Sequence, residues 1–224
     1  MAETENDRAR IAIADLEHHF NTNRLEAFSD GVFAIAITLL ILEIGVPHVG
    51  EGESLWSALK QEWPSFFGYG LSFISIGIMW INHHAMWRDI ERFDHSLLVL
   101  NLLLLMCISF VPFPTAVLAE NLKNDDAIRT ATLLYGGTFF AIAIVWNALW
   151  LYVMSKPHLL DEHVNKAALW EMTKRNFAGP VLYGAMLPLA FISPWISLGT
   201  YVLLSAMYLL PLHQGMLGAT TDDE

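Results

Sequence analysis

Residues 24–42 read RLEAFSDGVFAIAITLLIL, and this stretch decides the fold class of the chain. A charged and polar start is followed by a long apolar run. The whole approaches the roughly 20 residues that a helix needs to cross a hydrocarbon core of about 30 Å. Asp30 lies inside this segment, where a charge costs roughly 2.5–3.5 kcal/mol on insertion scales and needs a partner or water beside it. An ionisable residue in such a place indicates a functional site.

The composition of the whole chain indicates a membrane protein. It has 224 residues, of which 54% are hydrophobic, and its mean hydropathy is +0.42. A soluble domain of this size is less apolar, so we predict an all-α integral membrane protein with a single helical domain in the lipid bilayer. The net charge of −11 lies mainly at the ends and in loops, and it provides no basic face for nucleic acid. The single cysteine, Cys107, excludes an intrachain disulfide.

Six transmembrane helices per chain are expected. Prolines in the third and fifth spans are tolerated where neighbouring groups satisfy the carbonyls that they free. The polar linker 155–175 is expected to hold a short interfacial helix around residues 162–170. The chain then divides into a cytoplasmic arm (1–23), a transmembrane domain (24–212) and an acidic cytoplasmic tail (213–224). The expected spans are residues 25–45, 64–83, 96–119, 130–154, 177–193 and 195–212.

Lysine and arginine in the loops predict the orientation. With the N-terminus inside, the cytoplasmic segments hold nine of these residues and the outer loops hold three. An even number of spans returns the C-terminus to the same side. We therefore predict a multi-pass protein of the cell membrane with both termini in the cytoplasm. The first twenty residues are acidic and lack the apolar core of a signal peptide, which agrees with a cytoplasmic arm.

One face of the first helix carries a narrow, mainly apolar stripe. At 100° per residue, Ile35, Thr38 and Leu42 fall within about 60° of each other, and Gly31 lies one turn below Ile35. Asp30 is turned about 110° from the centre of this stripe and should point to neighbouring helices. Ordinary helix packing also produces such stripes. Candidate partners for Asp30, rich in donors and acceptors and predicted at the same depth, are Asn82, His83, His84 and Asn101.

The pattern Arg-x-x-x-Phe-Ser-Asp at residues 24–30, followed by the apolar helix, resembles the signature of the transmembrane protein 175 family of potassium channels. Six spans in a chain of 224 residues also resemble the prokaryotic branch of that family. The resemblance implies a homotetramer that conducts K⁺, with the first helices lining a central pore. It implies a constriction of aliphatic side chains at Ile35, with Thr38 and Leu42 above it, in place of a carbonyl filter.

The resemblance further implies a buried polar network that holds the pore helices in place. An aliphatic ring gates by narrowness and dewetting, so the position of these helices would decide whether ions pass. Thr38 hydroxyls would replace part of an ion's hydration shell between two aliphatic rings. The network would consist of Arg24, Phe28, Ser29 and Asp30 of the first helix, with Trp80, His84 and Asn101 as the expected partners.

Two other functions stay open from the residues alone. A proton-coupled secondary transporter would use Asp30 and His84 as a relay, although the sequence shows no paired interrupted helices in two symmetric halves. A membrane scaffold without transport would carry no ion current at all. The tripeptide GYG at 68–70 is no potassium filter, because it follows SFF rather than TV and lies inside a predicted span.

We expect neither an enzyme nor a cofactor or metal site. Adjacent histidines, as at 18–19 and 83–84, point about 100° apart, whereas metal-binding helices favour i, i+4 spacing. No nucleotide loop, nucleophile elbow or pair of catalytic carboxylates occurs in the sequence. Permeant K⁺ would be the only ligand.

Overall fold

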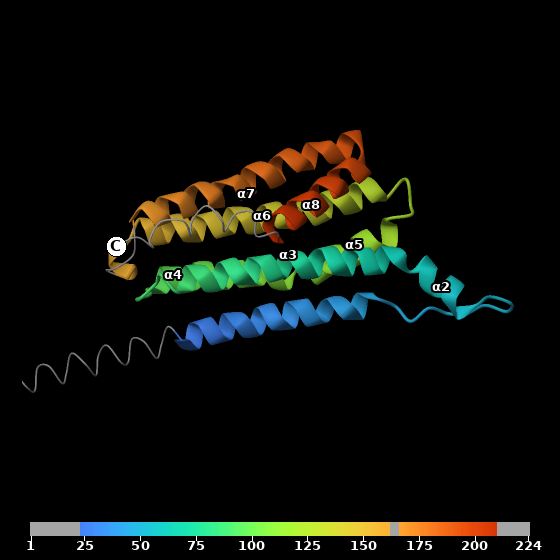
Figure 1. Cartoon of the computed structure of the whole chain (residues 1–224), viewed down its shortest axis with the longest axis horizontal. Coiled ribbons are helices and arrows are strands. Elements are labelled where there is room, and N and C mark those ends of the chain that lie inside the picture. The colour runs from blue at the N-terminus through green and yellow to red at the C-terminus, as the bar shows by residue number, and fades with distance from the viewer. Residues whose placement is uncertain (1–22, 162–165, 210–224) are drawn as a thin grey trace, which may run out of the picture.

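The computed structural model describes residues 23–161 and 166–209, which fold into a bundle of helices (Figure 1). Within these ranges the regular secondary structure is helical apart from an isolated β-bridge between Ile90 and Leu160. The all-α prediction is therefore confirmed. The predicted acidic tail and all but the last residue of the predicted arm lie outside the described residues, so that division of the chain stays a prediction.

The first helix covers Asn23–Glu43, and its last turn, η1 (Leu40–Glu43), tightens into a 3₁₀ helix. Spacings of three and four residues place its buried positions on a single face. That face points into the bundle, and the stripe of Ile35 lies on the opposite side of the helix. The buried positions, each at most 1% exposed, are Ser29, Phe33, Ala36 and Leu40.

α3 (Trp63–Trp87) follows a short helix, α2 (Leu55–Gln61), which the sequence analysis did not predict. The Ser54 side chain caps α2 by accepting a hydrogen bond from the Ser57 backbone N–H. Pro64 lies in the first turn of α3, where its missing N–H costs no helical hydrogen bond. The predicted second span lies wholly inside α3, which continues one turn further.

The third predicted span is not one continuous helix. It forms α4 (His95–Ser109) and α5 (Pro112–Asn121), with a turn between them. Pro112 and Pro114 have no N–H to donate to the carbonyls four residues back, so the helical hydrogen bonds are interrupted here. Taken together, His95–Asn121 is still long and apolar enough to cross a membrane.

α6 (Ile128–Met154) and α7 (Lys166–Ile192) are joined through the short helix η2 (Pro157–Leu159). α7 begins before residue 177, the predicted start of the fifth span, because residues 166–176 form its first turns; where this helix enters the membrane stays a prediction. Of the interfacial helix expected around residues 162–170, residues 162–165 lie outside the described residues, and residues 166–170 belong to α7 rather than to a separate helix. Hydropathy marks where a helix enters hydrocarbon, and a polar extension beyond that point leaves no such signal.

Pro180 interrupts the hydrogen bonds inside α7, and a side chain from α6 compensates. Proline has no N–H for the carbonyl four residues earlier, which belongs to Asn176. Asn147 of α6 donates its Nδ2 to that carbonyl at 2.9 Å and also to the carbonyl of Ala143 at 2.9 Å. This is the arrangement that lets proline occur within membrane helices.

Four of the described segments are long and apolar enough to cross a membrane: the first helix, α3, α4 with α5, and α6. α8 (Pro194–Leu209) follows α7 after a single residue, and its described part has 16 residues. The protein is thus an all-helical membrane protein. A count of six crossings, which would need α7 and α8 to span as well, stays a prediction.

The long helices run side by side in Figure 1, with the first helix at one edge of the bundle and α7 at the other. Large aromatic side chains fill the interior, each at most 2% exposed, and α6 supplies three of them. These three make α6 the centre of the packed core. The five largest buried side chains are Trp87, Trp150, Tyr135, Phe33 and Phe139.

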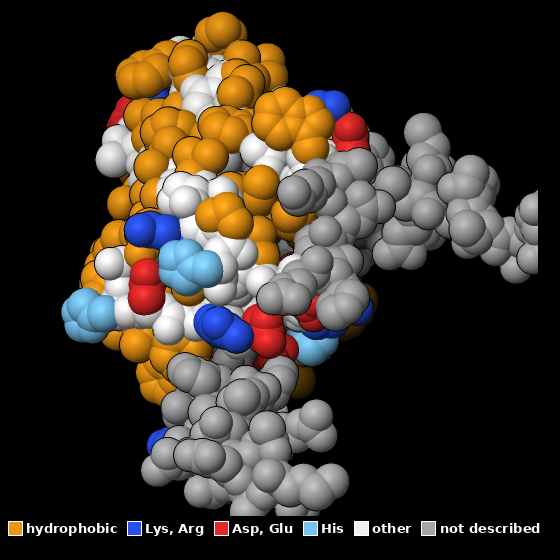
Figure 2. Space-filling model, turned by 90° about the vertical axis from the view of Figure 1, so that its left-hand side faces the viewer, with side chains coloured by type: hydrophobic (Ala, Val, Ile, Leu, Met, Phe, Trp, Pro, Cys, Tyr) orange, Lys and Arg blue, Asp and Glu red, His pale blue; other side chains and the backbone are white. Residues whose placement is uncertain are grey.

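Charged and histidine side chains gather at the end of the bundle where α3 ends and α4 begins (Figure 2). Two loops are joined there. Ile90 and Leu160 form the β-bridge, and the backbone N–H of Asp161 donates to the carbonyl of Asp89 at 3.1 Å. The link fixes the loop before α4 against the loop before α7.

Candidate functional site

The first helix is attached to the bundle by polar side chains in its N-terminal half. Ser29 is fully buried, and its Oγ accepts a hydrogen bond from Nδ2 of Asn101 on α4 at 3.0 Å. The Ser29 hydroxyl in turn donates to the carbonyl of Leu25 at 2.9 Å. Both functions of this hydroxyl are therefore used, and the helix is held against α4 at one defined point.

Asp30 is bound from α3. The indole Nε1–H of Trp80 donates to Oδ1 of Asp30 at 2.9 Å. This bond gives Asp30 the partner that a carboxylate within a candidate membrane span needs. The Trp80 ring also stacks on the ring of His84, with centroids 6.2 Å apart.

A third link joins His84 of α3 to Glu26 of the first helix. Nδ1 of His84 lies 2.7 Å from Oε1 of Glu26, and the histidine side chain is half exposed. Ser29, Asp30 and Glu26 thus tie the first helix to α3 and α4 over little more than one turn. Glu26 was not among the predicted site residues, because a glutamate near a membrane boundary resembles an ordinary surface residue.

His83, the neighbour of His84, lies in the buried core of this cluster. Its Nε2 accepts a hydrogen bond from the indole N–H of Trp87 at 2.8 Å and lies 3.0 Å from Oδ1 of Asn101. Its ring also packs on Phe33 of the first helix, with centroids 5.2 Å apart. Trp87 was not among the predicted site residues, and His83 was predicted only as one of the candidate partners of Asp30. Only the rotation of α3 about its axis shows which of two adjacent histidines points inward.

The stripe on the opposite face of the first helix is exposed in the single chain. Ile35 is 60% exposed and Leu42 is 72% exposed. The Thr38 hydroxyl donates to the carbonyls of Ala34 and Ile35 at 2.9 and 3.0 Å, which leaves its oxygen lone pairs outward. In the described ranges, therefore, these apolar side chains stay largely uncovered.

Arg24 and Phe28 are not drawn into the cluster. Both are exposed, and Arg24 makes no hydrogen bond or ion pair with any described residue. Arg24 and Ile35 are eleven positions apart, which at 100° per residue places both on nearly the same side of the helix. The structure therefore brings together Ser29, Asp30, Trp80 and Asn101, while Arg24 points along the exposed stripe.

A metal centre is not indicated. No group of three or more His, Cys, Asp or Glu side chains among the described residues is arranged to hold an ion. The histidines of the cluster instead contact carboxylate, amide and indole groups.

Comparison with known proteins identifies the class of protein to which this helical fold and its polar cluster belong. The family model of the endosomal/lysosomal potassium channel TMEM175 matches residues 24–112. A potassium channel of Chamaesiphon minutus is 46% identical over 191 residues, covering 84% of this chain and 94% of that protein. A potassium channel of Streptomyces collinus is 44% identical over 187 residues, covering 84% of this chain and 91% of that protein.

A solved structure agrees with these relatives. The crystal structure of a lysosomal potassium-selective channel TMEM175 homologue from Chamaesiphon minutus superposes with a TM-score of 0.77 at 44% identity, covering 84% of this chain and 96% of that one. Fold and relatives together define the class as an all-helical membrane channel rather than an enzyme. The chain belongs to the TMEM175 family, which confirms the resemblance drawn from residues 24–30.

Proposed function

We propose that this chain is a potassium-permeable channel of the cell membrane, in which the first helices of four copies line a central pore. The relatives named potassium channels support it, because each matches 84% of this chain and more than nine-tenths of its own length. The single observation that carries the proposal is the division of the first helix into two faces. One face is bonded and packed into the bundle, and the other exposes a row of aliphatic side chains.

A row of aliphatic side chains on the outside of a protomer suits a pore only in an assembly. Four copies around an axis would form rings of Ile35 and Leu42, with a ring of Thr38 between them. Aliphatic rings exclude water and ions when narrow and admit them when wider. The outward lone pairs of Thr38 are suited to a partly dehydrated cation at this point.

The polar cluster would then hold each pore helix in position. Ser29 and Asp30 bond to α4 and α3 within the same protomer, so the helix keeps its exposed face toward the axis. Arg24 and Phe28, with the exposed residues around them, would lie where neighbouring protomers meet. His84 would fix the N-terminal half of the first helix through its contact with Glu26. Trp80 would fix the same part through its hydrogen bond to Asp30.

Under this proposal, the basic residues in the loops decide how the chain is oriented in the membrane. Arg88 and Arg92 are exposed at one end of the bundle, which the positive-inside rule assigns to the cytoplasm. With α7 and α8 as fifth and sixth crossings, both termini would lie on that side.

The constriction is tested by Ile35→Asn in purified protein reconstituted into liposomes with a K⁺ gradient. We expect severalfold faster K⁺ flux, because an amide in the ring removes the barrier to wetting. Ile144→Asn on α6 is the matched control, because Ile144 is 48% exposed and lies outside the first helix. Equal flux in wild type and Ile35→Asn would refute the constriction, and equal acceleration in both variants would show an unspecific leak.

The transporter alternative is less well supported. Asp30 bonds to Trp80 and His84 pairs with Glu26, so the two residues of the supposed relay are not in direct contact. Flux that saturates with K⁺ and stops without a proton gradient would nevertheless favour it. Flux that follows the electrochemical gradient of K⁺ alone favours the channel.

A further inference from the structure

The short helix α2 carries an exposed tryptophan and an exposed lysine on one side. Trp56 is 67% exposed, and Nζ of Lys60 lies over its ring, 5.3 Å from the centroid. Trp56 and Lys60 are one helical turn apart, and Trp63, at the start of α3, follows Lys60 at the next turn. The three exposed side chains form a stripe that leads from α2 to the beginning of a candidate membrane span.

The start of α3 has the features of a membrane boundary. Trp63 stacks on Trp195 at the start of α8, with centroids 6.4 Å apart, and both rings are partly exposed. Exposed tryptophans at the ends of membrane helices lie at headgroup level. Lys60 precedes Trp63 by three residues, which is about 5 Å along a helix, and a headgroup layer is about 5–7 Å thick. A bilayer whose hydrocarbon core begins near Trp63 therefore has its headgroups at the level of Lys60, just beyond the end of the bundle where α2 lies in Figure 1.

The positive charge of Lys60 has no negative partner within the described ranges. Its side chain makes the cation–π contact with Trp56 but no hydrogen bond or ion pair. Another pair of this kind, Trp170 and Lys174 on α7, differs in this respect. Nζ of Lys174 lies 5.9 Å from the centroid of the Trp170 ring and 2.8 Å from Oε1 of Glu171. Lys174 is thus already paired with a carboxylate, whereas Lys60 is left for a partner outside the chain.

The charges around Lys60 narrow the kind of lipid that suits it. A lipid phosphate accepts charge-assisted hydrogen bonds from an ammonium group. Three glutamates, Glu51, Glu53 and Glu62, lie close to Lys60 in the sequence. A headgroup with a net negative charge would be repelled by these carboxylates. Phosphatidylethanolamine carries its own ammonium beside the phosphate, so its neutral headgroup avoids this repulsion.

We propose that the surface formed by Trp56, Lys60, Trp63 and Trp195 is a binding site for a zwitterionic phospholipid of the adjacent monolayer. Its phosphate lies on the Lys60 ammonium, and its acyl chains extend past Trp63 and Trp195. The bound lipid holds α2, and with it the connection between the first helix and α3, at the membrane surface. This site does not depend on ion conduction.

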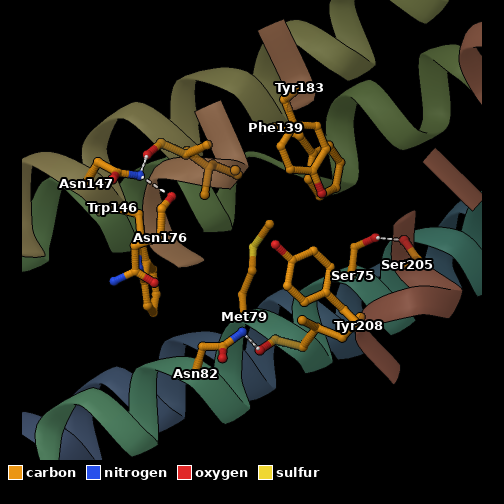
Figure 3. A pocket seen from close by; sticks show the side chains of 14 residues that line it. Ser75, Met79, Asn82, Phe139, Trp146, Asn147, Asn176, Tyr183, Ser205 and Tyr208 are labelled. Carbon is orange, nitrogen blue, oxygen red and sulfur yellow. Dashed lines mark hydrogen bonds between the residues drawn. The ribbon is translucent and has the colours of Figure 1, made fainter. Parts of the chain in front are cut away.

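The largest alternative place for part of a lipid is a cavity of about 110 Å³ between α3, α6, α7 and α8 (Figure 3). None of its lining residues carries a charge. It offers an acyl chain apolar surface but offers a phosphate no counter-charge. A difference in binding between lipids that share their acyl chains and differ in headgroup therefore reports on the surface at Lys60.

The test uses the full-length assembly in detergent and three lipid probes that have the same acyl chains, one of them labelled with pyrene. Phosphatidylethanolamine, phosphatidylglycerol and diacylglycerol are titrated separately, and energy transfer from tryptophan to pyrene measures binding. We expect saturable binding of phosphatidylethanolamine that is roughly threefold tighter than that of diacylglycerol, the gain of an exposed charge pair. Equal binding of these two probes would overturn the proposal and leave ordinary annular lipid only. Tighter binding of phosphatidylglycerol than of phosphatidylethanolamine would overturn it as well.

Two lysine variants locate the bound headgroup. Lys60→Gln removes the ammonium group, so phosphatidylethanolamine should bind no tighter than diacylglycerol. Lys174→Gln is the matched control, because Lys174 also lies over a tryptophan but already has Glu171 as its partner, and it should keep the difference between the probes. Thermal unfolding midpoints show whether both variants are folded. An undiminished difference in folded Lys60→Gln, or an equal loss in Lys174→Gln, would overturn the proposal.

Discussion

At the scale of single residues, one hydrogen bond supplies the partner that the Asp30 carboxylate needs within a candidate membrane span. Trp80 Nε1–H donates to Asp30, and Trp80→Phe would remove the donor while keeping an aromatic ring. We expect a lower midpoint of thermal unfolding, corresponding to about 1.5 kcal/mol, the lower end for hydrogen bonds to charged groups, because Trp80 is partly exposed. Trp56→Phe, at a tryptophan that is 67% exposed on α2, is the control. Equal midpoints for both variants would contradict this role.

We expect the Asp94 carboxylate, at the start of α4, to make the stability of the folded chain depend on pH. Hydrogen bonds from the Tyr152 hydroxyl and from the Leu97 backbone N–H hold the pKa of Asp94 below its ordinary value. The carboxylate therefore stabilises the folded chain above the ordinary pKa of about 3.9, and this contribution is lost as the pH falls through the lower folded pKa. We expect the thermal midpoint of wild type to fall on acidification below about pH 4.

Asp94→Asn isolates this charge, because asparagine caps a helix about as well as aspartate. Its thermal midpoint should fall less steeply over the same pH range. Parallel curves for wild type and variant would assign the acid sensitivity to other groups.

The partners of the first helix could be predicted only in part. Depth along the helices indicated Asn101, and the family resemblance indicated Trp80; the structure brings Asn101 to Ser29 and Trp80 to Asp30. Depth cannot distinguish His83 from His84, since adjacent residues differ by about 100° in direction and packing sets the rotation of α3. The structure buries His83 and leaves His84 half exposed against Glu26.

At the scale of helices, close approach of α6 and α8 depends on one glycine. A Cβ at Gly136 would lie 1.9 Å from the Tyr201 hydroxyl oxygen. Gly136→Ala should destabilise the fold by about 1–3 kcal/mol through overpacking. Gly137→Ala is an ideal control, because a Cβ there meets no atom within 4 Å.

Adding Tyr201→Phe to Gly136→Ala should recover part of the loss. The Tyr201 hydroxyl is buried and has no hydrogen-bond partner among the described residues, so its removal relieves the overlap at little cost. The effect is measured from the thermal unfolding midpoints of wild type, Gly136→Ala, Gly137→Ala and the double variant Gly136→Ala/Tyr201→Phe. A Gly136→Ala variant as stable as Gly137→Ala would show that Tyr201 moves aside freely.

Hydropathy predicted the existence of the long helices but not their ends. It could not locate the turn between α4 and α5, because Pro112 and Pro114 leave the segment as apolar as before. It also missed α2, a short helix specified by the Ser54 cap rather than by an apolar run. These features depend on individual hydrogen-bond donors and acceptors, which an average over side-chain polarity does not record.

At the scale of the whole molecule, the proposed orientation can be read from thiol labelling in intact cells. Ser54→Cys and Ser155→Cys, each in a Cys107→Ser background, lie at exposed positions separated by three candidate spans. A membrane-impermeant thiol reagent should label the first from outside and the second only after permeabilisation. The reverse pattern would invert the orientation, and labelling of both from outside would contradict the crossings between them.

The long sequence separation of the bonds at Ser29 and Asp30 bears on how the protein is made. Trp80 and Asn101 follow their partners by 50 and 72 residues, so the ribosome completes the first helix long before either exists. During that interval the Asp30 carboxylate must stay near the headgroups or take up a proton, since hydrocarbon offers no replacement donor. The segment synthesised first therefore reaches its final position only after the later helices have been inserted.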